Sequence, residues 1–189
     1  MHKSHFLHPI ILALLCVLLI SLTSQKKIDY EVVFDGNLEN QVQKELKKTS
    51  VLLSLQSKPV TSFFTLRRRM DQDLKRFHEL FRSLGYYDAK ITASIDRKNG
   101  TRVLFHITLG KQYLIESCKG IISIDNNRSQ LLDLSHVANN LPSTYANITD
   151  IEKQILASFK ECGYACTNIT DKKVVADCSA HKVFITFYV

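Results

Sequence analysis

The stretch that decides the fold is Phe81-Arg82-Ser83-Leu84-Gly85-Tyr86-Tyr87-Asp88-Ala89-Lys90-Ile91. It recurs, 78 residues further along (159 against 81), as Phe159-Lys160-Glu161-Cys162-Gly163-Tyr164-Ala165-Cys166-Thr167-Asn168-Ile169. An internal repeat of this kind indicates two copies of one supersecondary unit. In each copy we expect the glycine to end a helix, because it adopts left-handed geometry at no steric cost. The tyrosine that follows is expected to seal the edge of a helix–sheet core.

Hydrophobic periodicity around the first copy predicts the order strand, helix, helix, strand, strand. The strands are expected at residues 28–34, 90–96 and 102–109, with an Asn99-Gly100 hairpin turn between the last two. The first helix is expected at residues 37–50, with Asn37 as its N-cap. The second is expected to begin at Thr61 or Ser62 and to run to Leu84.

The second copy predicts the same order with a weaker pattern. Strands are expected at residues 113–124, 173–178 and 182–189, and helices at residues 130–140 and from Asn147 or Thr149 to Glu161. The predicted fold is therefore α+β. It is a tandem of two β-α-α-β-β units at residues 28–110 and 111–189, each a three-stranded mixed sheet covered by two helices.

The N-terminus has the pattern of a secretory signal peptide over residues 1–24. Its apolar run, residues 9–20, is too short for a bilayer core, which needs roughly 20 residues. Small residues suited to cleavage follow, at Thr23 and Ser24. An uncleaved membrane anchor is the alternative. Cys16 lies inside the apolar run after Leu15, which argues against a lipoprotein signal.

The charge of the exported part is uneven. Residues 25–110 hold 16 Lys and Arg against 10 Asp and Glu, whereas residues 111–189 hold 8 of each. The sharpest cluster is Arg67, Arg68 and Arg69, which is typical of a solvated helix face partly paired with Asp71, Asp73 and Glu79. The functional alternative is contact with anionic lipid or an acidic partner. Export makes nucleic acid the least favoured partner.

Four cysteines remain after the signal peptide, and all lie in the second half: Cys118, Cys162, Cys166 and Cys178. An even number in an exported chain is compatible with two disulfides, in any of three pairings. Free buried thiols are the second interpretation, and zinc is the least favoured. No nucleophile elbow, metalloprotease motif, calcium loop or phosphate loop occurs, so we expect neither an enzyme nor a cofactor.

Four segments of the first copy resemble a known family. They are Val32-Val33-Phe34-Asp35-Gly36-Asn37-Leu38, Leu66-Arg67-Arg68-Arg69-Met70-Asp71, Leu84-Gly85-Tyr86-Tyr87 and Leu109-Gly110-Lys111-Gln112-Tyr113. They look like the polypeptide-transport-associated (POTRA) domains of TamA/BamA-like outer-membrane assembly factors. The resemblance covers roughly residues 28–189 and is weaker in the second copy. Family members normally carry a further POTRA domain and a transmembrane β-barrel, and we expect this chain to be the POTRA part without the barrel.

The resemblance implies a periplasmic protein, associated with the outer membrane, that assists translocation or assembly of outer-membrane and autotransporter proteins. Its partners would be a β-barrel or translocation protein and unfolded client polypeptides. POTRA domains use their second strand as an edge, which an extended segment extends by β-augmentation. That strand comprises Lys90, Ile91, Thr92, Ala93, Ser94, Ile95 and Asp96. In the second copy, residues 173–177 correspond to it.

The sequence is also compatible with two other functions. A membrane-anchored envelope or cell-division scaffold with POTRA-like units would keep the apolar run uncleaved. A cysteine-stapled secreted adhesion or effector module would depend on the disulfides.

Overall fold

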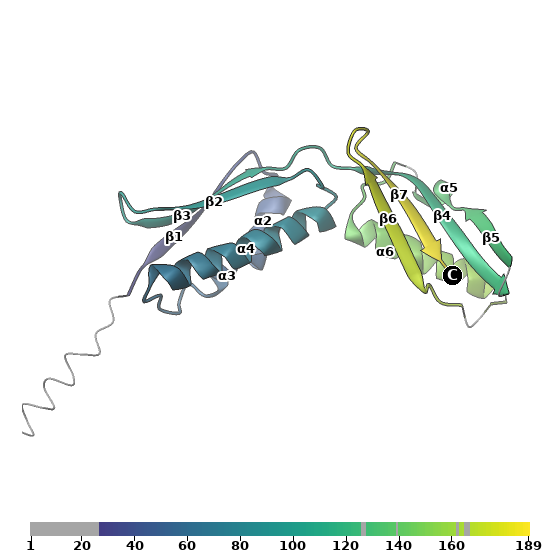
Figure 1. Ribbon diagram of the computed structural model, residues 1–189, viewed down its shortest axis with the longest axis horizontal. Coiled ribbons are helices and arrows are strands. Elements are labelled where there is room, and N and C mark those ends of the chain that lie inside the picture. Colours follow the sequence, from purple (N-terminus) through teal and green to yellow (C-terminus); the bar gives the residue numbers. More distant parts are fainter. Residues whose placement is uncertain (1–26, 126–127, 139, 162, 165–166) are drawn as a thin grey trace, which may run out of the picture.

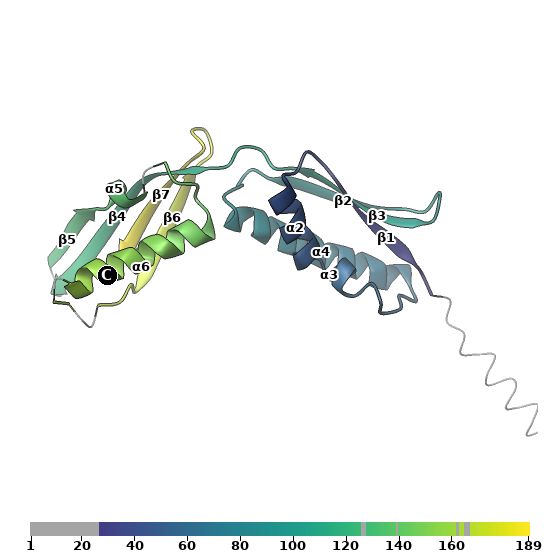
Figure 2. The same ribbon diagram turned by 180° about the vertical axis from the view of Figure 1, so that it is seen from behind.

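A computed structural model describes residues 27–125, 128–138, 140–161, 163–164 and 167–189. The chain forms two α+β units that lie end to end (Figures 1 and 2). The predicted α+β tandem is therefore confirmed. The predicted signal peptide lies outside the described residues.

The first unit is a three-stranded mixed sheet with helices on one face (Figure 1). Its strands, in the spatial order β1-β3-β2, are β1 (Tyr30–Asp35), β2 (Lys90–Asp96) and β3 (Thr101–Thr108). β1 pairs with β3 in parallel, and β2 pairs with β3 antiparallel. The helices are α2 (Asn40–Thr49), the short α3 (Val51–Ser54) and α4 (Phe63–Ser83).

The long helix α4 carries the core of this unit. Ser62 caps it, since its hydroxyl accepts a 3.2 Å hydrogen bond from the amide of Thr65, as the sequence predicted. Phe77 of α4 packs edge-on against Phe105 of β3, with ring centroids 5.1 Å apart. Phe34 of β1 stacks on Phe105 at 5.7 Å. These three rings join helix to sheet and so fix the face of the sheet that α4 covers.

The second unit departs from the prediction in its sheet. It has four strands in the order β5-β4-β7-β6: β4 (Leu114–Asp125), β5 (Arg128–Asp133), β6 (Asp171–Asp177) and β7 (Lys182–Tyr188). Its helices are α5 (Ser135–Ala138) and α6 (Tyr145–Glu161). A three-stranded sheet was predicted, so the strand number was wrong for this unit.

The extra strand β5 occupies the first part of the segment where a helix was expected, at residues 130–140, and the four-residue α5 lies in the rest of it. β4 runs for 12 residues and pairs with β7 on one side only, so its other side offers unpaired backbone groups to β5. Leu131 is 63% exposed, and Leu132 is half-buried, as in a strand with alternating faces. Asp133 accepts a 2.9 Å hydrogen bond from the amide of Ser135, where the four-residue α5 begins.

Two predicted helix starts were also wrong. α2 begins at Asn40 after Glu39, not at Asn37, and Glu39 makes no side-chain capping bond. α6 begins at Tyr145, because the hydroxyl of Thr144 already accepts a 3.2 Å hydrogen bond from the amide of Asn147. Short polar residues cluster before both helices, and sequence alone does not choose among them.

The repeated corner has the same hydrogen bonds in both units. Gly85 and Gly163 have positive φ angles of 84° and 92°. The amide of Tyr86 donates to the carbonyl of Phe81 at 2.8 Å, and the amide of Tyr164 donates to that of Phe159 at 3.0 Å. This six-residue hydrogen-bonded turn ends a helix on a glycine. The repeat is therefore a structural one.

Candidate functional site

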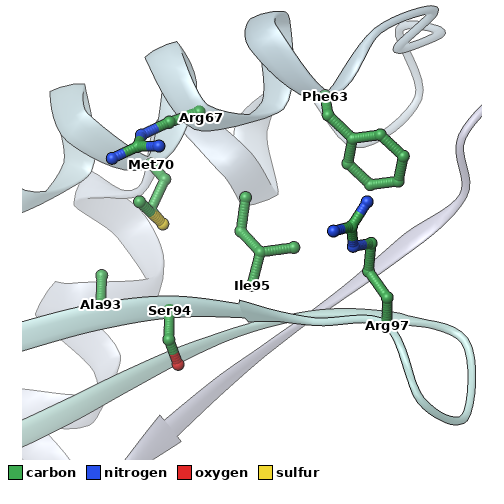
Figure 3. A pocket seen from close by; sticks show the side chains of 7 residues that line it. All are labelled: Phe63, Arg67, Met70, Ala93, Ser94, Ile95 and Arg97. Atoms are coloured by element: carbon green, nitrogen blue, oxygen red, sulfur yellow. The ribbon is translucent and has the colours of Figure 1, made fainter.

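The strand predicted to bind partners lies at an edge of the first sheet. β2 has the predicted bounds and pairs with β3, and no other strand among the described residues pairs with its outer side. Its burial alternates, with Ile91, Ala93 and Ile95 packed against the core under α4. Ser94 points away from the helix (Figure 3). An extended backbone can therefore approach the free edge of β2.

A groove of about 350 Å³ runs between α4 and this edge (Figure 3). Phe63, Arg67 and Met70 line it from α4, and Ala93, Ser94, Ile95 and Arg97 line it from β2 and the residue that follows. The three helix positions are spaced i, i+4 and i+7, so they share one face of α4. That spacing is present in the sequence, but Phe63 and Arg97 were not among the predicted site residues, and Met70 was noted only within the segment that resembles the family.

The groove is apolar between the two elements and cationic at its walls. Arg67 stands on α4, and the guanidinium of Arg97 lies 4.8 Å from the ring centroid of Phe63 (Figure 3). Within the described part of the chain, neither arginine forms an ion pair. Phe63 and its neighbour Phe64 are 40% and 78% exposed. The site thus combines unpaired positive charge with accessible aromatic surface.

The structure divides the predicted basic cluster. Arg67 and Arg68 are exposed, whereas Arg69 is buried. The Nη1 atom of Arg69 donates to the carbonyl of Leu55 at 3.1 Å and lies 3.4 Å from the hydroxyl of Tyr30. Arg69 therefore holds the segment that precedes α4 and does not contribute to a surface patch.

Asp73, one of the acids expected to pair on a solvated face of α4, is also buried. Its carboxylate accepts hydrogen bonds from the hydroxyl of Ser50 at 2.6 Å and from the amides of Val51 and Leu52. It thereby caps α3, and a buried carboxylate needs such donors to offset its lost hydration. Arg69 and Asp73 lie about one helical turn apart on α4, and both are buried with hydrogen-bond partners from the segment before α4. These contacts anchor α4 and thereby position the groove.

The corresponding edge of the second unit is different. The predicted residues 173–177 lie in β6, which is an edge strand. Lys172 of this strand reaches α6, where its Nζ atom lies 2.9 Å from Glu152 and 5.8 Å from the ring centroid of Tyr145. This contact bridges β6 and α6, the position that corresponds to the groove of the first unit.

The two units meet at the corner after α4. The carbonyl of Gly85 accepts a 2.9 Å hydrogen bond from the amide of Tyr113, and that of Leu84 accepts one from Gln112 Nε2 at 2.8 Å. Tyr113 is fully buried, and its ring lies 5.1 Å from that of Tyr87. Burial foremost, and then its hydrogen bond to Asp88, raise the pKa of Tyr113. The junction is thus a packed contact and not a free linker.

The described cysteines are not paired with one another. Cys118 is a buried thiol, and Cys178 is exposed. Burial, and secondarily the charge of Asp133, raise the pKa of Cys118 to about 11. Cys162 and Cys166 lie outside the described residues. Within the part of the chain that the structure describes, no group of three His, Cys, Asp or Glu side chains is arranged to hold a metal ion. No described helix is both long and apolar enough to span a membrane.

No family model matches the sequence, and no curated protein matches it. Among solved structures, the chain is similar to POTRA domains 1–3 of the periplasmic domain of Omp85 from Anabaena, with a TM-score of 0.51 and 12% identity, over 87% of this chain and 62% of that one. The POTRA 1–2 structure of the same domain gives a TM-score of 0.49 and 12% identity, over 87% and 97%. Haemophilus influenzae BamA POTRA 3–5 gives 0.42 and 18%, over 86% and 65%. At these identities the similarity shows the fold alone, and that fold is POTRA-like.

Proposed function

We propose that this protein is a periplasmic strand acceptor that assists the translocation or assembly of outer-membrane proteins. It binds an extended segment of a client or of a β-barrel partner by adding it to the free edge of β2. One observation carries this proposal. In a POTRA-like fold, an edge strand lies beside an accessible groove, and no described strand pairs with that edge.

The chemistry of an edge strand suits this function. Its outward N–H and C=O groups are unpaired, and an added strand satisfies them with main-chain hydrogen bonds. Such binding needs no catalytic group and accepts many sequences, as unfolded clients require. The predicted signal peptide supports an exported location, and the TamA/BamA-like segments of the first unit support a role beside a barrel.

Site-specific photocrosslinking tests the proposal. A photoreactive amino acid replaces Ser94 in β2 or, as the control, Glu31 in β1, which is exposed in the opposite edge strand. Each purified variant receives an unfolded outer-membrane β-barrel polypeptide diluted from urea. We expect adducts from position 94 and few from position 31. Equal yields at both positions, or none at either, would contradict binding at β2.

A further inference from the structure

The chemistry of the groove goes beyond general strand binding. We propose that it selects extended segments that place an acidic residue next to an apolar one on the side that faces α4. This inference rests on the proposed function, since the same edge of β2 holds the backbone of the segment. It names the class of segment that binds: acidic–apolar strands over neutral or basic ones.

Strand geometry determines which residues of the segment are recognised. Side chains alternate along a strand, so only every second residue of an added strand faces α4, roughly 7 Å from the next. Those residues lie beside Ala93 and Ile95, which point toward the helix (Figure 3). The intervening residues lie on the side of Ser94 and meet solvent. A two-residue spacing between the acidic and the apolar residue is therefore the recognised pattern.

The apolar requirement follows from the interior of the groove. Met70 and Ile95 lie between α4 and β2, and Ala93 leaves room beside them (Figure 3). An aliphatic or aromatic side chain entering here removes apolar surface from water. Met70 is unbranched and adapts to side chains of different shape. The pocket accordingly takes apolar residues without selecting one of them.

The acidic requirement follows from the two arginines. Arg67 lines the groove from α4 and Arg97 from the residue after β2, and among the described residues they are the only charged ones that line it. Asp96 pairs with Arg102 at 3.4 Å, and no described acid lies within ion-pair distance of either arginine. Arginine binds a carboxylate through two parallel N–H donors, so a Glu or Asp of the segment fits here.

Phe63 holds the Arg97 side chain in place before a carboxylate binds. The ring holds the guanidinium at 4.8 Å by a cation–π interaction, which reduces the entropy lost when a carboxylate binds. The edges of the guanidinium remain open to a ligand while its face is stacked. An arginine held in this way also discriminates against lysine-bearing segments, because like charges repel.

Fluorescence anisotropy with a defined probe tests the inference. The probe is a labelled ten-residue peptide in which every second residue is Thr. The other positions hold Leu, except for one Glu, and two variants carry Gln or Lys in place of that Glu. We expect the Glu peptide to bind about tenfold more tightly than the Lys peptide, with a difference that shrinks as NaCl rises. The Gln peptide is expected to fall between them.

Charge reversals in the full chain locate the effect. Arg67→Glu and Arg97→Glu should each abolish the preference for Glu and favour the Lys peptide. Arg68→Glu is the matched control, since Arg68 is exposed on the same helix, lies outside the groove and gives the same change in net charge. Circular dichroism checks that all three variants fold.

The outcomes separate this inference from the proposed function. Equal binding of the three peptides, with crosslinking retained at position 94, overturns the charge selectivity and leaves strand binding intact. Loss of crosslinking at position 94 in every case overturns strand binding itself. A third result is that the protein binds phosphatidylglycerol vesicles and that no peptide competes with the vesicles. In this case Arg67→Glu and Arg68→Glu weaken vesicle binding equally. That result assigns the basic face to lipid and overturns the inference.

Discussion

The hydroxyl of Tyr113 donates a 2.6 Å hydrogen bond to Oδ2 of Asp88, and this bond ties the second unit to the corner of the first. Tyr113 is completely buried, and the ring of His181 packs edge-on against it at 5.3 Å. Asp88 lies two residues after the repeated Gly85-Tyr86 pair. The turn that ends α4 is thus also part of the joint between the two units.

Tyr113→Phe tests the contribution of this bond. The substitution keeps the buried ring and removes only the donor, while Asp88, partly exposed, is rehydrated. We expect a loss of about 1 kcal/mol in the free energy of unfolding. Tyr87→Phe is the control, because its hydroxyl lies 3.5 Å from the carbonyl of Ser143 and should contribute less than about 0.5 kcal/mol. Urea denaturation measures both, and equal losses would contradict the assignment.

Stability at alkaline pH tests the raised pKa of Tyr113. In the folded chain, burial and Asp88 keep the phenol protonated at a pH where an unfolded tyrosine, with a pKa near 10, ionises. Above about pH 10 the folded state binds more protons at this site than the unfolded state does. The contribution of Tyr113 to the free energy of unfolding is therefore constant below about pH 10 and becomes less favourable as the pH rises above it. Tyr113→Phe should make this fall shallower. The exposed Tyr145 serves as control: Tyr145→Phe should keep the wild-type slope.

Substitutions of Arg69 and of Arg68 should change the stability of the fold by different amounts. Arg69→Met removes the hydrogen bonds of a buried guanidinium to the carbonyl of Leu55 and the hydroxyl of Tyr30, so we expect a loss of about 1–3 kcal/mol. Arg68→Met changes an exposed side chain and should stay within about 0.5 kcal/mol of wild type. Thermal unfolding followed by circular dichroism measures both variants. A smaller loss for Arg69→Met than for Arg68→Met would mean that the buried contacts are not made.

Gly85 and Gly163 form a matched pair. Both have positive φ, so alanine at either position should cost about 1 kcal/mol. A Cβ at Gly85 would also meet Oγ of Ser143 at 3.2 Å and Cγ of Gln112 at 3.4 Å, whereas no atom of the described residues lies within 4 Å at Gly163. We therefore expect Gly85→Ala to destabilise more than Gly163→Ala in urea denaturation. The reverse order would contradict the packed junction.

The two described cysteines should differ in reactivity. Cys118 is buried with a pKa raised to about 11, so little nucleophilic thiolate forms at pH 8. Cys178 is exposed. Alkylation of the native chain with iodoacetamide, followed by peptide mass mapping, should label Cys178 within minutes and Cys118 only after unfolding. A disulfide that protects Cys178 in the oxidised protein but not in the reduced one would contradict the free thiol.

Local sequence signals predicted the first unit better than the second. The bounds of β2 follow from the alternation of Ile91, Ala93 and Ile95, and Ser62 was one of two predicted caps for α4. In the second unit, Leu131, Leu132 and Leu134 are compatible with either a helix or a strand. This segment forms a strand because it pairs antiparallel with β4, which directly precedes it in the chain, while β7 pairs with the other side of β4. The pairing of β4 with β7 joins residues far apart in sequence, and no local pattern contains it.

The sequence by itself determined the repeat, the α+β order of the first unit and the position of the glycine corners, because these follow from short-range backbone preferences and periodicity. Only the tertiary structure decided what each charge does. It buried Arg69 and Asp73 with partners from residues 30 and 50–55, and it left Arg67 and Arg97 exposed on the two elements that line one groove. The sequence shows charge at all four positions, but whether a charge is paired or open depends on elements that only folding brings together.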